Sequence, residues 1–510
     1  MDEPNAVPVI GLEIHAQVLT RSKAFCGCST AVADAPNAHT CPVCLGHPGA
    51  LPVLNAAVLR AAVLLGRALG SDIHPRSAFA RKHYFYPDLP KGYQITQHRE
   101  PVCTGGTMAF VGSDGTEHDI RLERIHMEED AARLLHRGDA SLADYNRAGI
   151  PLLEIVTTPA FTSAADAAAF MRELRRVLVY CGICDGSMER GSLRCDANVS
   201  LRRTDGSPGT RTEIKNMNSF RAVERALNWE IARQRALLKG GKAVASATLL
   251  WDEDAGEARI MRGKESSADY HYMPEPDLPP AVVTQEHIDA ADASIPELPL
   301  ARQRRFLEKY ALPALDAEVL TAERSIADYF EDVVRHLTAA RTDSDAGAVE
   351  TGMRTVPAKF ASNWIMGEVL RGMREAGLSS PPVEAARLAE LLRCIGDGTV
   401  SGSAAKRVLA AMAESNNAPE EIIDRLGLRL LRDDDTLRAQ VREVLNAHPK
   451  QCAAFYAGKE KLLGFFVGQV MQRSGGSADP KRAAILLREA LSRHGDEDAN
   501  ASSPSGKGES

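Results

Sequence analysis

Residues 9–18 read Val-Ile-Gly-Leu-Glu-Ile-His-Ala-Gln-Val, in which apolar and polar side chains alternate over the second half. A period of two is typical of a β-strand, because successive side chains point to opposite faces of a sheet. Glu13, His15 and Gln17 therefore share one face of the expected strand, and the apolar residues between them share the other. This polar face is compatible either with a solvated surface or with a polar site, and the stretch alone leaves both open.

Alternation of this kind recurs up to about residue 290, and helical periodicity separates the alternating segments. The strand-like segments are IRLERIHMEE at 120–129, PLLEIV at 151–156, RCDANVSLRR at 194–203 and RTEIKN at 211–216. The helical patterns cover Ala56–Leu69, Ala164–Tyr180 and Phe220–Leu238. Strands and helices do not follow a regular strand–helix–strand rhythm, so the pattern predicts an α+β fold with a mixed, largely antiparallel sheet.

A proline-rich run at residues 273–280 marks the exit from this region, and the chain beyond about residue 301 has helical periodicity almost throughout. Helices are expected at Arg302–Tyr310, Ser325–Leu337, Phe360–Met373 and Val383–Leu392, with an exposed loop at Arg341–Gly352. We predict four parts: a sheet-rich catalytic domain at 1–293, a helical linking domain at 294–400, a helical tail domain at 401–493 and a disordered C-terminus at 494–510.

The composition describes an ordinary water-soluble protein. The chain has 510 residues and a net charge of −7, which does not indicate a nucleic-acid binder. Residues 401–490 differ, because they hold fourteen Lys or Arg against eleven Asp or Glu, a net charge of +3. The sequence contains no run of about 18 apolar residues, so it predicts no membrane span. The N-terminus lacks the features of a secretory signal. Six cysteines outside the cluster described next are scattered, which favours a reducing cytoplasm.

Four of the ten cysteines lie close together in two pairs, Cys26 with Cys28 and Cys41 with Cys44. Two short-spaced pairs within one segment are typical of a structural zinc site, in which four thiolates surround the ion as a tetrahedron. The sequence therefore predicts a zinc ion bound by these four residues.

A second candidate site depends on carboxylates in apolar surroundings. Glu154 interrupts an otherwise apolar strand, and an unpaired buried carboxylate costs several kcal/mol, so it needs a cation or a strong donor. Glu128, Glu129 and Asp130 supply further acids. Together with the imidazole of His15 they make a plausible Mg²⁺ site, provided that the strands meet.

Cations and aromatic rings mix in residues 81–94, which include Lys82 and suit phosphates and a stacked base. A rigid surface loop explains the same composition. The polar side chains of two later segments, 194–203 and 211–216, could line a cleft. Pairing of these side chains across a sheet explains the same pattern equally well. The candidates for nucleotide binding are Arg194, Asp196, Asn198, Glu213 and Lys215. Any ATP is not held by a P-loop, since GxxxxGK[ST] is absent from the sequence.

Long motifs in this order resemble one family, the B subunit of the tRNA-dependent amidotransferase. The motifs are GLEIHAQV, FCGCST, CPVCLGHPGALPVLN, FARKHYFYPDLPKGYQITQ, RIHMEEDAARLLH, DYNRAGIPLLEIV, GSLRCDANVSLR, EIKNMNSF, YHYMPEPDLPP and GFFVGQVM. The resemblance covers nearly the whole chain. It implies a cradle domain, a helical domain and a helical tail that contacts tRNA.

The resemblance also implies a reaction and its residues. A family member would be a ligase subunit (EC 6.3.5.-) that uses ATP to phosphorylate the side-chain carboxylate of mischarged Glu-tRNA(Gln) or Asp-tRNA(Asn). Ammonia that an amidase A subunit releases from glutamine would then displace the phosphate. Matching motifs place the Mg²⁺ ligands on His15, Glu128 and Glu154, with Glu13 beside them and Lys82 on the route to the active site.

Partners follow from the same resemblance: the A subunit, a small C subunit that completes a heterotrimer, and mischarged tRNA, with no membrane. The tail residues expected to meet tRNA phosphates are Lys459, Lys461, Arg473, Lys481 and Arg482. An alternative is a zinc-containing assembly subunit that binds tRNA without chemistry of its own. A self-sufficient aminoacyl-tRNA synthetase is disfavoured, since the sequence has neither HIGH nor KMSKS.

Overall fold

The computed structural model describes residues 6–203, 206–263, 270–339, 358–430, 434–474 and 478–501, without the side chains of 262–263 and 493–501. The chain divides into two compact units, Met1–Arg304 and Arg305–Ser510. The loop expected at Arg341–Gly352 lies outside the described residues.

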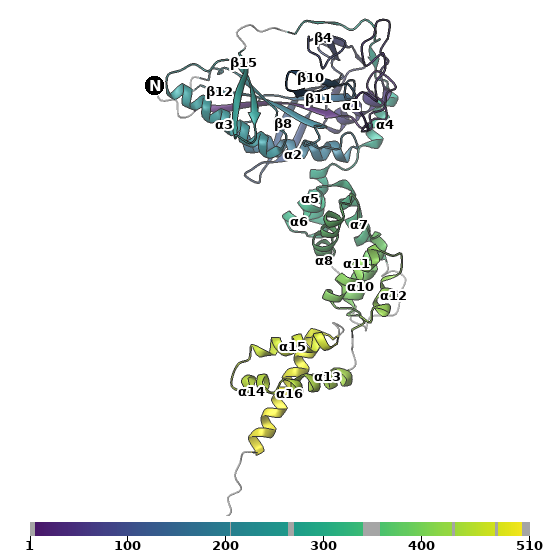
Figure 1. Ribbon diagram of the computed structural model, residues 1–510, viewed down its shortest axis with the longest axis vertical. Coiled ribbons are helices and arrows are strands. Elements are labelled where there is room, and N and C mark those ends of the chain that lie inside the picture. The colour runs from purple at the N-terminus through teal and green to yellow at the C-terminus, as the bar shows by residue number, and fades with distance from the viewer. Residues whose placement is uncertain are drawn as a thin grey trace, which may run out of the picture. The chain divides into compact units, whose positions relative to one another are not determined.

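A ten-stranded sheet forms the centre of the first unit (Figure 1), and the long N-terminal strand lies in its middle. Along the sheet the order is β15-β14-β13-β12-β1-β11-β8-β6-β2, and β7 pairs with β8 outside this path. All these pairs are antiparallel except β13 with β14. The strands are β1 (Val7–Gln17), β2 (Asp72–Ile73), β6 (Cys103–Thr104), β7 (Thr107–Val111), β8 (Glu117–Glu129), β11 (Pro151–Thr157), β12 (Leu193–Arg202), β13 (Thr212–Lys215), β14 (Ala247–Asp252) and β15 (Glu257–Gly263).

Three amphipathic helices cover the apolar face of this sheet: α1 (Ala56–Ala68), α2 (Ala164–Tyr180) and α3 (Phe220–Lys239). Figure 1 shows α2 and α3 lying against the sheet on the side away from β4. The side chains of Ser163 and Ser219 accept hydrogen bonds from the first turns of α2 and α3 and so fix where these helices begin. With its apolar face covered, the sheet leaves its other face free for polar side chains.

Smaller elements complete the first unit. A three-stranded sheet of β16 (Tyr272–Pro274), β4 (Ala80–His83) and β5 (Tyr93–Thr96) approaches the polar face, where β5 contacts β8. The hairpin β9 (Arg133–Arg137) and β10 (Ala140–Asp144) follows β8, and β3 (Arg76–Ser77) pairs with β17 (Ala281–Val282). Helix α4 (Gln285–Ser294) packs on α1, so the residues just after the proline-rich run remain with the sheet.

The second unit is helical and has two separate hydrophobic cores. The first core is formed from residues between Phe306 and Leu428, and the second from residues between Leu437 and Leu491. The first group contains α5 (Pro299–Tyr310, which begins in the first unit), α6 (Ala314–Leu320), α7 (Arg324–Ala339), α8 (Ala358–Trp364), the π-helical turn η1 (Ile365–Val369), α9 (Leu370–Ala376), α10 (Ala385–Gly396), α11 (Gly402–Ala413) and α12 (Pro419–Arg425). The second contains α13 (Asp434–Ala447), α14 (Pro449–Tyr456), α15 (Leu462–Arg473) and α16 (Pro480–Ala501).

The predicted α+β class with a largely antiparallel sheet is confirmed. The expected helix at Phe360–Met373 is divided into α8, η1 and α9, because a π-helical turn interrupts its regular hydrogen bonding. Helix α16 runs to Ala501, beyond the expected start of disorder at residue 494, since an established helix extends more easily than a new one forms. No helix among the described residues is long and apolar enough to cross a bilayer.

Candidate active site and candidate metal centre

Strand register brings the polar side chains of four segments onto one face of the large sheet. His15 on β1 lies opposite Glu154 on β11 and opposite Arg194 on β12, and Glu154 in turn lies opposite His126 on β8. Glu13 lies opposite Asp196. Residues in such lateral rows point to the same side of a sheet. The sequence could place these residues on strand faces, but the antiparallel pairing of β8, β11, β1 and β12 brings them together.

His15, Glu128 and Glu154 form a compact group that we call the carboxylate–imidazole triad. The His15 Nε2 atom lies 3.3 Å from Glu128 Oε1 and 3.4 Å from Glu154 Oε2. One ligand atom from each residue lies within 4.8 Å of the others, which is close enough for one cation. Both carboxylates are buried, with Glu128 2% and Glu154 9% exposed. The predicted magnesium ligands therefore meet in space, although their role stays a prediction.

His126 belongs to this site, and the sequence interpretation missed it. Its Nε2 atom lies 3.1 Å from Glu154 Oε2 and 3.8 Å from Glu128 Oε2, and its side chain is buried. Its Nδ1 atom has no hydrogen-bond partner among the described residues. The signal was available, since His126 and Glu128 are two residues apart on a strand and must share a face.

Burial and charge act in opposite directions on the triad. Burial disfavours the imidazolium form of His15, but the negative charges of Glu154 and Glu128 outweigh it and raise its pKa to about 9. Burial together with the nearby Glu154 charge raises the pKa of Glu128. Burial also opposes ionisation of Glu154, yet His126 and His15 hold the pKa of this carboxyl well below its usual value. The triad therefore favours a bound positive charge.

A cavity of about 270 Å³ opens above the triad, on the polar face of the sheet. His15 and Glu128 line it from the large sheet, and Lys82 lines it from β4. The Lys82 Nζ atom lies 4.6 Å from the centre of the Tyr270 ring, an aromatic contact that favours a cation. Burial opposes the charged form of Lys82, but Glu128 outweighs it and raises the pKa of the ammonium. A cation from one sheet thus faces the carboxylates of the other.

The five residues expected to contact nucleotide are held mainly by one another and by their neighbours. The Lys215 ammonium bonds to Asp196 and lies 2.9 Å from Glu213. Asn198 donates to Glu13 Oε1 at 2.9 Å. Arg194 donates to the buried Asp130, which also accepts from Gln17 Nε2 at 2.9 Å. Of the five, Arg194 and Asp196 line the cavity.

The donor set of the triad fits a hard divalent cation. Mg²⁺ takes oxygen ligands and retains several waters. The triad offers two carboxylates, and one of them, Glu128, lines the open cavity. Thr96 Oγ1 donates to Glu128 Oε2 at 3.3 Å, which leaves the other carboxylate oxygen of Glu128 toward His15. Such outer contacts orient metal-binding carboxylates.

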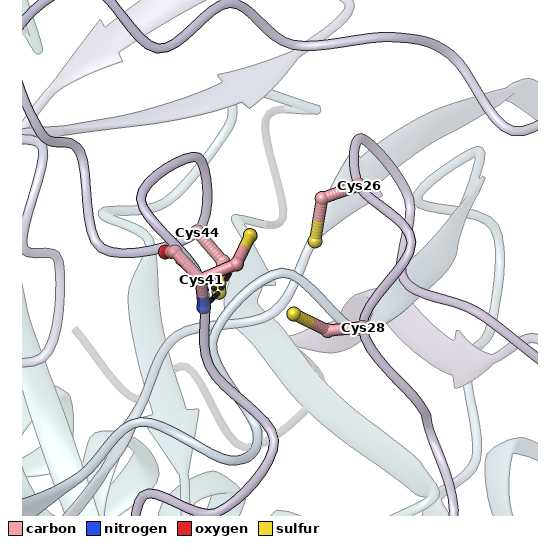
Figure 2. A group of neighbouring side chains, drawn as sticks. All are labelled: Cys26, Cys28, Cys41 and Cys44. Carbon is pink, nitrogen blue, oxygen red and sulfur yellow. Dashed lines mark hydrogen bonds between the residues drawn. The ribbon is translucent and has the colours of Figure 1, made fainter.

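The second cluster contains the four cysteines predicted as zinc ligands. Cys26 and Cys28 lie on one loop and Cys41 and Cys44 on another, and Figure 2 shows their sulfur atoms turned toward a common centre. The four sulfur atoms lie within 4.8 Å of one another, and none of the cysteines forms a disulfide. In a tetrahedral site with Zn–S bonds of about 2.3 Å, sulfur atoms are separated by about 3.8 Å, so these residues fit zinc.

The thiols of this cluster are coupled through hydrogen bonds. A bond between Cys26 and Cys44 raises the pKa of Cys26 and lowers the pKa of Cys44 to about 4. The backbone N–H of Cys41 donates to Cys44 Sγ at 3.2 Å. Zinc binds cysteine in the thiolate form. Contacts within the cluster already stabilise a thiolate at Cys44, without a contribution from a metal ion.

The expected tRNA contacts of the tail divide into two kinds. Lys459, Lys461 and Lys481 are exposed. Arg473 donates to Glu443 at 2.8 Å, and Arg482 donates to Asp434 at 2.8 Å. Because their charges are already partnered, the two arginines offer less to a phosphate than the three lysines do.

Comparison with known proteins gives two family matches along the chain. The GatB/GatE catalytic domain matches residues 8–289, which include the triad and the four cysteines. The GatB domain matches residues 348–491. Together the two matches cover most of the sequence.

Full-length relatives agree with these matches. A protein of Pelodictyon phaeoclathratiforme is 48% identical over 485 residues, covering 94% of this chain and 98% of that protein. A Geobacter sulfurreducens protein is 48% identical over 495 residues, covering 96% and 99%, and one of Anaeromyxobacter dehalogenans is 47% identical over 489 residues, covering 95% and 98%. Each of the three is named as the B subunit of an aspartyl/glutamyl-tRNA(Asn/Gln) amidotransferase. The chain belongs to the GatB family.

Proposed function

We propose that this member of the GatB family uses ATP to phosphorylate the side-chain carboxylate of mischarged Glu-tRNA(Gln), Asp-tRNA(Asn) or both, and then forms the amide with ammonia. Membership in the family makes the chain a subunit of a tRNA-dependent amidotransferase, a glutamine-hydrolysing ligase of translation. The mechanism and the substrates are the further step. A carboxylate needs a leaving group before ammonia can displace it, and phosphorylation supplies one.

The carboxylate–imidazole triad, of which His15 and Glu128 line a cavity, carries this proposal. His15, Glu128 and Glu154 would hold Mg²⁺, which when bound neutralises phosphate charge during phosphoryl transfer. Lys82 faces the same space from β4 and would orient an anionic group, such as the carboxylate of the substrate or the phosphate. Glu13, beside the triad, has a pKa raised by burial and by Glu154, so a second cation nearby would stabilise its charged form.

The nucleotide would lie along the neighbouring part of the polar face. Arg194 and Asp196 line the cavity. On the next strand, β13, the Lys215 ammonium contacts both Asp196 and Glu213. Asn198 connects this group to Glu13. An incoming nucleotide would exchange some of these internal contacts for contacts to phosphate. The residues proposed to contact the nucleotide are Arg194, Asp196, Asn198, Glu213 and Lys215.

Zinc at Cys26, Cys28, Cys41 and Cys44 would be structural, because four protein ligands leave no open position for a substrate. The ammonia would come from an amidase A subunit, and a small C subunit would complete a heterotrimer in the cytoplasm. The tail would hold the tRNA through Lys459, Lys461 and Lys481, with weaker contributions from Arg473 and Arg482, since phosphate contacts depend on unpartnered positive charge.

Phosphate release by the assembled complex tests the proposal. The complex with its A and C subunits is given ATP, Mg²⁺ and mischarged Glu-tRNA(Gln) or Asp-tRNA(Asn). Wild type is expected to release phosphate only with a mischarged tRNA, and the responsive tRNA identifies the substrate. In Glu154→Gln the release is expected to fall by a factor on the order of 100 or more, because the residue acts on charge that develops during the reaction.

Glu123→Gln is the matched control, since Glu123 lies on the same strand β8 with an exposed side chain whose charged neighbour is Arg124, at 4.0 Å, and not a residue of the triad. It removes one carboxylate from the same sheet without touching the triad, so its phosphate release should equal that of wild type. Unchanged release in Glu154→Gln would place the chemistry elsewhere. The chain would then be the zinc-containing, tRNA-binding assembly subunit.

A further inference from the structure

Lys23 is a fully buried lysine outside the proposed catalytic machinery. Its exposed fraction is 0%. Within the part of the chain that the structure describes, no carboxylate forms an ion pair with it. A buried ammonium without a counter-charge costs several kcal/mol. The residue therefore needs an anionic partner of another kind.

The contacts of the Lys23 ammonium indicate that partner. Its Nζ atom donates to the backbone oxygen of His39 at 2.8 Å and to that of Tyr145 at 3.2 Å. The third contact is to Cys44 Sγ at 3.6 Å. An ammonium has three N–H donors, so these three acceptors satisfy it completely. The sulfur is the one acceptor of the three that can carry a full negative charge.

The surrounding backbone keeps Lys23 beside the cysteine cluster. Gly149 has a φ of +85°, and a Cβ atom built on it would lie 3.5 Å from both Lys23 Cδ and Cys44 Cβ. The backbone N–H of Lys23 also donates to Cys28 O at 2.9 Å. The lysine stem thus packs between the two cysteine loops and the segment that leads into β11.

We propose that Lys23 is the built-in counter-cation of the four-cysteine metal site. A Zn²⁺ ion bound by four thiolates keeps an excess of negative charge, and the buried ammonium offsets part of it at the Cys44 sulfur. The same ammonium ties the charged cluster to the backbone at His39 and Tyr145. Lys23 is a positioning residue of the metal site, and this role rests on the proposed binding of zinc.

Zinc retention in the full-length chain tests the role of Lys23. Zinc content is first measured in wild type, and the rate of release to a colorimetric chelator is then compared with that of Lys23→Met. Loss of the charge is expected to speed release about tenfold, in the range found for outer partners of metal ligands. A wild-type chain without zinc would contradict the zinc site itself, whereas zinc-bound wild type with unchanged release in Lys23→Met would contradict the role of Lys23 alone.

Two further variants separate charge from packing. Lys23→Gln keeps amide donors for the backbone oxygens without the charge, so it should also release zinc quickly; retention at the wild-type rate would overturn the proposal. Asn146→Ala removes the side chain that accepts from His39 N at 2.8 Å and donates to Ala35 O at 2.8 Å, and so loosens the same segment without touching Cys44. It should release zinc at nearly the wild-type rate.

Substitution of Co²⁺ for zinc gives a charge-transfer band whose energy depends on the hydrogen bond to sulfur and not on packing alone. A hydrogen-bond donor on sulfur raises the energy of the thiolate-to-Co²⁺ charge-transfer band. The band is expected to shift to lower energy in both Lys23 variants and to stay in place in Asn146→Ala. Equal acceleration of zinc release in Asn146→Ala, with the band unmoved in all variants, would mean that Lys23 only fills space.

Discussion

The four-cysteine cluster and the carboxylate–imidazole triad are both metal-competent, but they are assembled differently. The cysteines lie between residues 26 and 44, on two loops of one short segment. The triad takes His15 from β1, Glu128 from β8 and Glu154 from β11. The first cluster depends on local spacing, and the second depends on the register of three strands that lie far apart in the sequence.

This difference determines what each cluster can do. Four thiolates close around an ion and leave it no free position, which suits a structural role. The triad provides fewer ligands beside an open cavity, so a cation there would keep positions for substrate oxygens. Removing the first site should therefore mainly affect stability, and changing the second should mainly affect binding and catalysis.

The largest expected effect is on stability, from Cys44→Ser. Loss of a structural metal is among the changes that reduce the free energy of unfolding most, here by on the order of 4 kcal/mol. Chemical denaturation of zinc-loaded wild type and variant, followed by circular dichroism, measures it. Cys103→Ser is the control, because Cys103 is a buried cysteine outside the cluster. Equal losses in the two variants would remove the special role of the cluster.

The triad should instead respond to pH through its affinity for metal. His15 must lose its proton to bind Mg²⁺, and its pKa is raised to about 9. Affinity should thus rise about tenfold per unit as the pH increases toward 9. Without metal, the free energy of unfolding should change with pH in the opposite direction. The His15 imidazolium stabilises the fold fully below the pKa of about 6.5 that histidine has in the unfolded chain. This stabilisation is lost as the pH rises through 9.

Calorimetric titration with Mg²⁺ measures how the metal affinity depends on pH. Denaturation with a chelator present measures how the stability of the metal-free protein depends on pH. Both are compared between wild type and His15→Gln. The variant should flatten both slopes, because it removes the titrating group. A metal affinity that does not change between pH 7 and pH 9 would show that His15 is not a ligand.

His126→Asn should have a smaller effect on the same site. The imidazole lies 3.1 Å from Glu154 and helps to hold this carboxylate in place, so its loss should weaken Mg²⁺ binding by about tenfold. Calorimetry on the full-length chain measures this without relying on turnover. His118→Asn is the control, since His118 lies on β8 with a partly exposed side chain and contacts Asp114 instead. Unchanged Mg²⁺ affinity in His126→Asn would exclude His126 from the site.

The smallest effects are expected in the tail, outside both clusters. Lys459→Ala, Lys461→Ala and Lys481→Ala should each weaken tRNA binding only a few-fold and lower its salt dependence, as single phosphate contacts do. Arg473→Ala should change binding less, because the guanidinium is paired with Glu443. Filter binding at several salt concentrations ranks the variants. An arginine effect larger than the lysine effects would reverse this assignment.

Much of the fold followed from periodicity, and the failures have local causes. Helix α2 begins and ends at the expected residues, since Ser163 caps an apolar stripe that stops at Tyr180. Helix α4 was not predicted, because Gln285–Ser294 is short and weakly amphipathic and follows a proline-rich run. The π-helical turn at Ile365–Val369 also has no clear signal in a sequence that continues to read as one helix.

The candidate site was predictable residue by residue but not as a site. Period two placed Glu13 and His15 on one face, and an acid in an apolar strand made Glu154 conspicuous. For His126, the spacing from Glu128 predicted a shared strand face but not the residue opposite it. Only the pairing of β8 with β11 shows that it faces Glu154. The roles of these residues stay predictions until the variants are measured.

Side-chain period and spacing over a few residues were enough to predict the α+β class, the polar and apolar faces of the strands and the two cysteine pairs. The folded arrangement was needed to show that His15, Glu128, Glu154 and His126 meet, and that Lys23 lies against Cys44. Such contacts join residues up to about 140 positions apart, and their distances depend on strand register and backbone packing, which no local pattern encodes.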